Sequence, residues 1–435
     1  MSKTRLFKYF DIVILILLAL FFITEHHFKF TAVKNISLYL SFLLVFCLFL
    51  IDKKSLFLNL KTNFNSAKPA FLAIIFFIIY VAVVSFFPYD PRFNSFKEAF
   101  SEFGRGSVFL IVILCWFDGS KDKIKFMFYS VILAFIFVTI SYSKPLFFNF
   151  NDIDAETFES GRIISRAYAD YVDRFLAFGL ISMLFFRSNS IRFLSLILCI
   201  ILPIIMDVLA GARGSYLAGF VCIVLFFIIS YQNGFKEIYK KNLKYIVVFA
   251  AICFSAIFLI LFDSSIAKYK LSQGSYSSGR DLILKERLPL LLNSPRAFVG
   301  LGYGKDQYDS FLRDENDKGA NISMMQIHKD SGERFWWNDE PFFVGKYYYY
   351  GVFGTSMLVF IVLWLVLVSY SKFKTTRNLM YLAIFLSVIA YFGVRGLFES
   401  INLRILYMFY MVGFVMMLNS YYKKDSDENF AYKKR

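Results

Sequence analysis

Three short polar clusters interrupt an otherwise apolar chain, and each carries residue types that bind anions or move protons. In the first cluster, residues 211–215, Arg213 stands in a tight turn that also contains Gly211 and Gly214. A planar guanidinium suits phosphate or carboxylate recognition, although an arginine at the edge of an apolar run can also simply snorkel to the membrane surface. Both interpretations are open for Arg213 on its residues alone.

The second cluster, residues 277–281, predicts the start of a helix. Ser278 precedes a periodically apolar stretch, so Arg280 falls in the first turn and Arg287 about two turns later on roughly the same face. This basic face either binds an anion or is the solvated side of an amphipathic helix. The glycine-rich residues 300–304 lack the strand–helix context of a nucleotide loop, and predict a turn with close backbone approach.

The third cluster, residues 336–346, places two adjacent acids, Asp339 and Glu340, at the entrance of a long apolar run. Carboxylates at the edge of a membrane helix are costly unless they are paired or functional. They either pair with a neighbouring arginine or, in the functional interpretation, accept a proton during catalysis. Trp337 beside them is typical of the aromatic belt at a membrane interface.

Metal and cofactor sites are not predicted. The three histidines are His26, His27 and His328, and no grouping of His, Cys and Asp has metal-ligand spacing. The five cysteines lie in apolar runs, where neither a disulfide framework nor a thiolate metal site is expected. If an anionic group leaves from a substrate here, arginine rather than metal is expected to stabilise it.

The elements that must position these clusters are membrane helices. Of the 435 residues, 58% are hydrophobic and 18% are charged, whereas a soluble domain carries about 25% charged residues. The net charge of +16 fits basic loops beside anionic lipid better than a nucleic-acid-binding face, so no nucleic-acid partner is expected. The predicted fold class is an all-α polytopic membrane protein.

Apolar runs of sufficient length predict about twelve membrane spans. The fourth is short and is open to being longer or re-entrant. The predicted spans are 7–24, 36–51, 70–87, 105–117, 124–143, 172–186, 193–209, 215–231, 245–262, 347–370, 379–394 and 402–418.

An even number of spans places both termini on one side, and the short lysine-rich loops assign that side to the cytoplasm. The outer side receives two long segments, 144–171 and 263–346, with a larger share of arginine. The predicted organisation is spans 1–9 in residues 1–262, a large periplasmic loop in 263–346, spans 10–12 in 347–420 and a cytoplasmic tail in 421–435. The polar tail is predicted to be disordered.

The order of the clusters is similar to that in the O-antigen ligase/polymerase superfamily of bacterial envelope enzymes. The matching stretches are residues 209–219, 277–304 and 337–354. Ligases of this family carry His-Asn some eleven residues before a Gly-x-x-Gly that opens the next span. Here the glycines are Gly351 and Gly354, and Glu340 stands eleven residues before the first. An acid in that place resembles the Wzy-type polymerases, which join repeat units.

The resemblance implies a GT-C-like fold and a metal-independent, inverting glycosyl transfer at the periplasmic face of the bacterial inner membrane. The implied partners are undecaprenyl-pyrophosphate-linked glycans, membrane lipids and, as a further candidate, a chain-length regulator. Glu340 is then the predicted base, and Arg213 and Arg280 are the predicted stabilisers of the departing pyrophosphate. The predicted substrate-binding residues are Arg166, Arg287, Arg395, Asp339, Trp337 and Tyr303, the last two by stacking on sugar rings.

Two alternatives stay open. The first is a ligase or a capsule polymerase of the same fold. The second, from a different class, is a flippase or transporter for the lipid-linked glycan, which needs charged or polar groups inside its spans. The predicted spans have almost no ionisable residues in their middle, and this observation favours the enzyme over the flippase.

Overall fold

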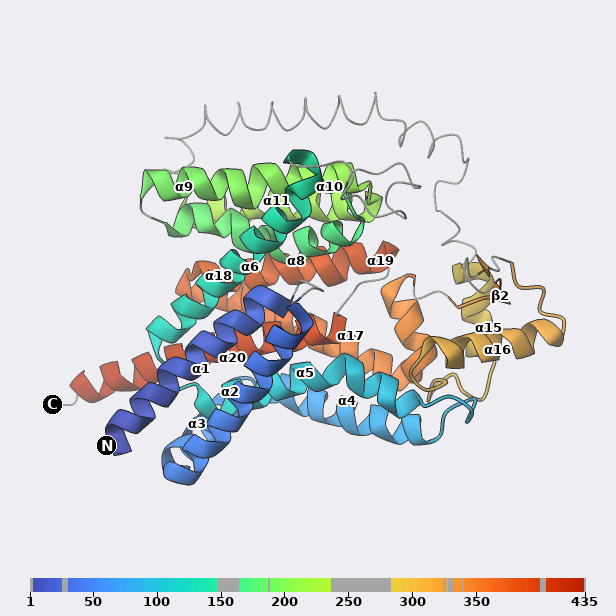
Figure 1. Ribbon diagram of the computed structural model, residues 1–435, viewed down its shortest axis with the longest axis horizontal. Helices are drawn as coiled ribbons and strands as arrows, with labels where there is room; N and C mark the ends of the chain where they lie inside the picture. The colour runs from blue at the N-terminus through green and yellow to red at the C-terminus, as the bar shows by residue number, and fades with distance from the viewer. Residues whose placement is uncertain are drawn as a thin grey trace.

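The computed structural model describes residues 3–25, 30–147, 164–186, 188–235, 283–323, 326–327, 332, 334–337, 340–399 and 404–433. Within these ranges the protein is almost entirely helical (Figure 1). The single sheet of this part is the antiparallel pair β1 (Gln326–Ile327) and β2 (Arg334–Phe335).

The N-terminal half forms a bundle of helices. Its elements are α1 (Lys3–Glu25), α2 (Thr31–Ile51), α3 (Lys53–Ser66), α4 (Lys68–Phe86), α5 (Ser95–Trp116), α6 (Lys121–Phe147), α8 (Ala167–Phe185), α9 (Asn189–Leu196), η3 (Ile197–Ile201), α10 (Leu202–Ala210), α11 (Arg213–Ser230) and η4 (Tyr231–Phe235). The segment α9–η3–α10 is one helix that contains a wider turn, and α11 continues into η4 in the same way.

The C-terminal half adds short outer elements and three more long helical segments. The short elements are η5 (Ile283–Arg287), α15 (Leu288–Leu292) and α16 (Lys305–Asp317). The long segments are α17 (Phe342–Thr376), the run of α18 (Leu379–Val388), η6 (Ile389–Arg395) and α19 (Gly396–Phe398), and α20 (Arg404–Lys433). α20 continues as a helix through residues 423–433, the tail for which the sequence predicts disorder. Extending an existing helix costs far less than starting one.

Ten helices among the described residues are long and apolar enough to cross a membrane. The prediction of an all-α, multi-pass membrane protein is therefore confirmed in this coarse form. The predicted span 172–186 lies in α8, which is less apolar because it carries charged residues. The predicted span 245–262 lies outside the described residues, so the number twelve stays a prediction. The short fourth run is a full helix, since α5 begins at Ser95.

The loops gather at two opposite ends of the bundle. At one end, Lys424 Nζ donates to the Asp118 carbonyl at 3.2 Å, and Asn378 Nδ2 donates to Tyr422 Oη at 3.1 Å. Both chain termini lie at this end, and α15, α16 and β2 lie at the other (Figure 1). The lysine-rich loops and the long arginine-containing segment thus lie at different ends, as the sequence predicts. Which end faces the cytoplasm stays a prediction.

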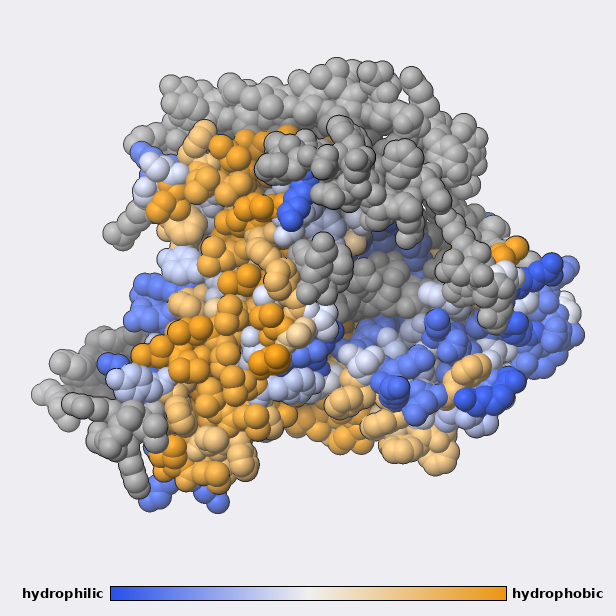
Figure 2. All heavy atoms as spheres, viewed as in Figure 1, coloured by the Kyte–Doolittle hydropathy of each residue, from blue (hydrophilic) through white to orange (hydrophobic). Residues whose placement is uncertain are grey.

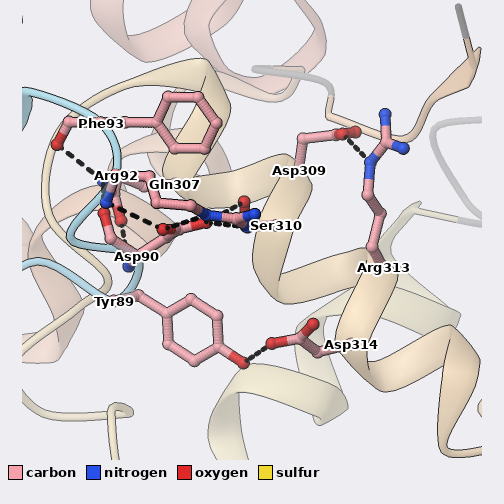
Figure 3. Close-up of polar contacts among 9 residues, drawn as sticks. All are labelled: Tyr89, Asp90, Arg92, Phe93, Gln307, Asp309, Ser310, Arg313 and Asp314. Carbon is pink, nitrogen blue, oxygen red and sulfur yellow. Dashed lines mark hydrogen bonds and ion pairs between the residues drawn. The ribbon is translucent and has the colours of Figure 1, made fainter.

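A clamp around Asp90 holds α16 against the connection between α4 and α5 (Figure 3). The Asp90 N–H donates to Gln307 Oε1 at 2.7 Å, and Gln307 Nε2 returns a hydrogen bond to the Asp90 carbonyl at 2.7 Å. Ser310 Oγ donates to Asp90 Oδ2 at 2.9 Å, and Tyr89 Oη donates to Asp314. These contacts hold the segment that contains η5, α15 and α16 against the end of the bundle. This segment, residues 283–317, is called the outer segment below.

α17 is broken at Gly351, where the backbone has φ +63° and ψ −171°. The backbone N–H and C=O groups that lose their helical partners at this break form hydrogen bonds with the backbone of residues 297–302. The Leu301 N–H donates to the Tyr348 carbonyl at 2.9 Å, and the Val352 N–H donates to the Ala297 carbonyl at 3.0 Å. Irregular backbone at membrane depth needs such partners. The predicted turn with close backbone approach is thereby confirmed.

The surface divides as a membrane protein requires. Apolar side chains cover the bundle, and polar side chains gather over the end that carries α16 (Figure 2). Exposed apolar residues occur on membrane-length helices, for example Leu50, Phe86 and Leu367. A lipid environment makes this exposure favourable, whereas water does not.

Candidate functional site

The candidate site is a layer of buried charges beneath the outer segment. It starts on α8, where Asp170, Asp173 and Arg174 lie three and four residues apart and so share one face. All three are buried, at 1–2% exposure. Arg174 pairs with Asp170, and its guanidinium lies 5.4 Å from the centre of the Tyr391 ring. α8 packs against α6, α10, α11 and α18, so these charges lie inside the bundle.

Arg395, at the end of η6, links α8 to α19. Its Nη1 lies 2.5 Å from Asp173 Oδ2, and its Nη2 lies 3.2 Å from Glu399 Oε2. Ser215 Oγ, on the first turn of α11, donates to Asp173 Oδ1 at 2.9 Å. The Arg395 side chain is only 4% exposed, so this predicted residue is held deep in the site by carboxylates on two elements.

Arg166, directly before α8, extends the chain of charges toward the surface. Its Nη2 lies 3.2 Å from Glu399 Oε1 and 3.8 Å from Glu340 Oε1. The Glu399 side chain is 3% exposed, whereas Arg166 and Glu340 are 41% and 24% exposed. Glu399 thus joins two arginines predicted from separate parts of the sequence, Arg166 and Arg395, and Arg166 in turn lies beside the predicted Glu340.

The glycine turn of the first cluster lies against the same carboxylate. Gly211 ends α10 in the left-handed region, with φ +68°. A Cβ at Gly214 would lie 3.1 Å from Glu399 Oε1, which is tighter than ordinary packing. Arg213 is the first residue of α11, which places its backbone at the site, whereas its side chain lies outside the described part of the structure.

Asp207 is a further carboxyl group in this layer. It lies near the end of α10, is 5% exposed, and its Oδ1 has no hydrogen-bond partner within the described part of the chain. The Asp207 carboxyl group interacts electrostatically with the nearby charges of Asp173, Arg395 and Glu399. A buried carboxylate with unsatisfied hydrogen-bonding capacity is costly, so a role beyond packing is the default hypothesis for Asp207.

A second buried layer lies across α1, α2, α5 and α17. Lys346 Nζ lies 3.1 Å from Glu102 Oε1, and Arg105 Nη1 lies 2.9 Å from Glu25 Oε1. Lys346 is fully buried, and its ammonium lies 4.9 Å from the centre of the Tyr303 ring. Buried paired charges therefore occur near the ends of the helices, while the expectation that the middle of the predicted spans has almost no ionisable residues still holds for the residues named here.

The other predicted residues are distributed as follows. Arg287 is 1% exposed, so the alternative of a solvated helix face is wrong for it; Tyr348 Oη donates to its carbonyl. Tyr303 packs on Tyr349, with 4.9 Å between ring centres. Trp337 stacks on Phe335 at 5.7 Å and donates its backbone N–H to Asp309 Oδ1 at 3.3 Å. Arg280 and Asp339 lie outside the described residues.

Sequence reasoning missed Asp170, Asp173, Asp207 and Glu399. Each is an ionisable residue at the border of an apolar run, and an acid in such a place is itself a signal. The position of these acids beside apolar runs could have identified them as candidates. Their spacing in the sequence does not reveal which arginine pairs with which acid.

The chemistry open to this site is anion binding and proton transfer. Among the described residues, no group of three His, Cys, Asp or Glu side chains is arranged to hold a metal ion. Comparison with known proteins finds no family model, no curated protein and no solved structure that matches the chain. The function therefore has to be argued from the site itself.

Proposed function

We propose that this protein polymerises undecaprenyl-pyrophosphate-linked repeat units into O-antigen or a related surface polysaccharide, at the periplasmic face of the bacterial inner membrane. One observation carries the proposal. The acid predicted to be the base, Glu340, lies 3.8 Å from the predicted Arg166, and Glu399 joins Arg166 to the predicted Arg395 at the polar end of a membrane bundle. The resemblance of the sequence to the polymerase family supplies the reaction and the GT-C-like fold.

The proposed reaction is a substitution at the anomeric carbon of the growing glycan. Glu340 accepts the proton of the attacking sugar hydroxyl, whose oxygen forms the new glycosidic bond with inversion. The bond from the anomeric carbon to lipid pyrophosphate breaks, and the pyrophosphate leaves with the electron pair. Guanidinium groups stabilise the charge that develops on it. Arg166 and Arg395 are the described candidates, and Arg213 and Arg280 remain proposed with them.

The arrangement of the surface supports this proposal. The apolar sides of the bundle provide an environment for a polyprenyl chain, and polar side chains gather over the end that carries α16 (Figure 2). A lipid-linked substrate needs both environments in adjacent positions. Arg166 and Glu340 are the partly exposed residues of the charged row, at 41% and 24%, so a substrate can reach them.

The test is polymerisation by the purified protein on lipid-linked repeat units. Glu340→Gln is nearly isosteric but cannot accept the proton, so we expect the rate to fall by about 10²–10⁴-fold. Asp339→Asn is the matched control for the loss of one carboxylate in the same segment, and we expect a smaller loss. A Glu340→Gln variant that is folded and retains the wild-type rate would contradict the assignment of the base.

A second candidate, a flippase for the lipid-linked glycan, gains support from the buried charges of α8, α10 and η6. Intramembrane charges of this kind mark transport pathways as well as catalytic sites. Gene deletion separates the candidates. We expect single-repeat lipopolysaccharide for a polymerase, whereas unattached polymer indicates a ligase, and lipid-linked units trapped on the cytoplasmic face indicate a flippase.

A further inference from the structure

Glu399 divides its carboxylate between two arginines from different parts of the chain. Oε1 lies 3.2 Å from Arg166 Nη2, and Oε2 lies 3.2 Å from Arg395 Nη2. The Glu399 side chain is 3% exposed, so little water competes for these contacts. Both guanidiniums therefore lie within ion-pair distance of one shared anionic group.

A carboxylate and a phosphate group present similar acceptor oxygens to guanidinium donors. A group held between two guanidiniums therefore occupies the position that a phosphate group of a ligand would take. In the described structure this position is filled by a side chain of the protein itself, Glu399.

The two arginines differ in how firmly they are held. Arg395 keeps a second partner at 2.5 Å, Asp173 Oδ2, so it stays fixed when Glu399 moves away. Arg166 lies outside α8, its side chain is 41% exposed, and its contact to Glu340 is longer, at 3.8 Å. Arg395 is suited to be the fixed side of an anion site, and Arg166 the side that a ligand reaches first.

Glu399 is placed to move without breaking a long helix. It ends the three-residue α19, where its own backbone is already extended, with φ −129° and ψ 156°. On its other side it is confined by Gly214, where a Cβ would come within 3.1 Å. Release of both guanidiniums therefore requires movement of the Glu399 side chain, but not the breaking of a long helix.

We propose that Glu399 is an internal competitor for a diphosphate, and that the pyrophosphate of the lipid-linked substrate binds Arg166 and Arg395 by displacing it. The identity of this ligand rests on the proposed function. The device keeps the arginines paired and preorganised while no substrate is bound. It also weakens binding of the diphosphate product, because Glu399 returns to the arginines when the product dissociates.

The experiment measures binding of inorganic pyrophosphate to the full-length protein in lipid nanodiscs by titration calorimetry. Glu399→Gln removes the competing charge, and one lost charge-assisted contact corresponds to roughly tenfold tighter binding. Arg395→Lys should weaken binding, because lysine lacks the bidentate fork. Glu315→Gln is the charge-matched control, since this acid pairs with Lys318 in the outer segment, and we expect unchanged affinity.

Folding is checked by the thermal unfolding of each variant. If Glu399→Gln does not fold, Glu399→Asp serves instead, because its shorter side chain cannot reach both guanidiniums, and the same gain is expected. Unchanged or weaker pyrophosphate binding by a folded variant overturns the inference, even if the protein polymerises glycans. Tighter binding without any polymerisation by the wild-type protein leaves this inference standing and removes the proposed function.

Discussion

Viewed residue by residue, the site is a row of alternating charges in which every described arginine already has an acidic partner. Glu340, Arg166, Glu399, Arg395 and Asp173 follow one another at distances of 2.5–3.8 Å. An arginine so paired attracts a further anion less strongly, because part of its charge is already compensated. The release of one carboxylate partner therefore favours anion binding at this site.

Asp173 and Asp207 should differ sharply on neutralisation, although both are buried. Asp173→Asn removes a partner of Arg395 and leaves that guanidinium undercompensated, so we expect the free energy of unfolding to fall by about 3 kcal/mol. Asp207→Asn removes a carboxyl whose Oδ1 lacks a hydrogen-bond partner in the described structure. We expect unchanged or increased stability, to within about 1 kcal/mol. Thermal unfolding in detergent compares the two, and equal destabilisation would contradict this distinction.

The sequence predicted part of this row and not the rest, for a physical reason. Glu340 and Arg395 stand beside runs of apolar residues, whereas Arg166 was predicted only through the resemblance to the polymerase family. Glu399 was missed although it lies four residues from Arg395. Its importance comes from Arg166, which is far away in the chain and reaches it only through the packing of α8 against the helices around η6.

At the scale of the elements, the sequence predicts the features that depend on membrane thickness, such as helix length. It does not predict the features that depend on tertiary packing, such as a break inside a helix. The length of an apolar run is fixed by membrane thickness, and the predicted runs match most of the long helices. The break in α17 could not be located in this way, because Gly351 lies inside an uninterrupted aromatic and apolar stretch. The backbone groups that the break leaves without helical partners form hydrogen bonds with the loop of residues 297–302, and these bonds compensate for the break.

Gly351→Ala should therefore disrupt the fold. At this φ of +63° a side chain is strained, and a Cβ would lie 2.3 Å from the Phe298 carbonyl oxygen. We expect a loss of several kcal/mol of stability, or no folded protein. Gly393→Ala is the matched control in η6, because the nearest atom to its Cβ is Ile389 Cγ2 at 3.9 Å; we expect a change within about 1 kcal/mol. Fluorescence-detected size exclusion and thermal unfolding measure both.

The docking of α16 should depend on pH through Asp90. Hydrogen bonds from the Arg92 side chain and backbone and from Ser310 hold the pKa of Asp90 well below its usual range, although burial opposes them. A lowered carboxyl pKa stabilises the fold above the unfolded value of about 3.9, and this stabilisation is lost as the pH falls through and below that value. Hydrogen exchange in α16 should rise on acidification.

The control for this dependence is the variant without the carboxylate. Asp90→Asn should show rapid exchange in α16 already at neutral pH, with a smaller further increase in acid. Glu315→Gln, which removes an acid of the same helix that pairs with exposed Lys318, should behave like the wild type. An acid response in Asp90→Asn as large as that of the wild type would show that other groups control the docking.

For the whole molecule, the proposed function requires that the end of the bundle with the candidate site faces the periplasm. The loops with many lysines contact one another near the C-terminal helix, where Lys424 reaches Asp118. The candidate site lies at the other end, with the outer segment. Because lysine-rich loops stay in the cytoplasm, the site should face the periplasm.

Cysteine labelling with a membrane-impermeant maleimide tests this orientation in intact cells with a permeabilised outer membrane. Asp317→Cys, at the exposed end of α16, should be labelled, and Thr375→Cys, exposed near the end of α17, should react only after lysis. Ser310 is unsuitable as a probe because it is 8% exposed and bonded to Asp90. The five native cysteines are first replaced by alanine, so that only the introduced thiol reports. The reverse labelling pattern would place Glu340 and Arg166 on the cytoplasmic side and contradict the proposed polymerisation at the periplasmic face.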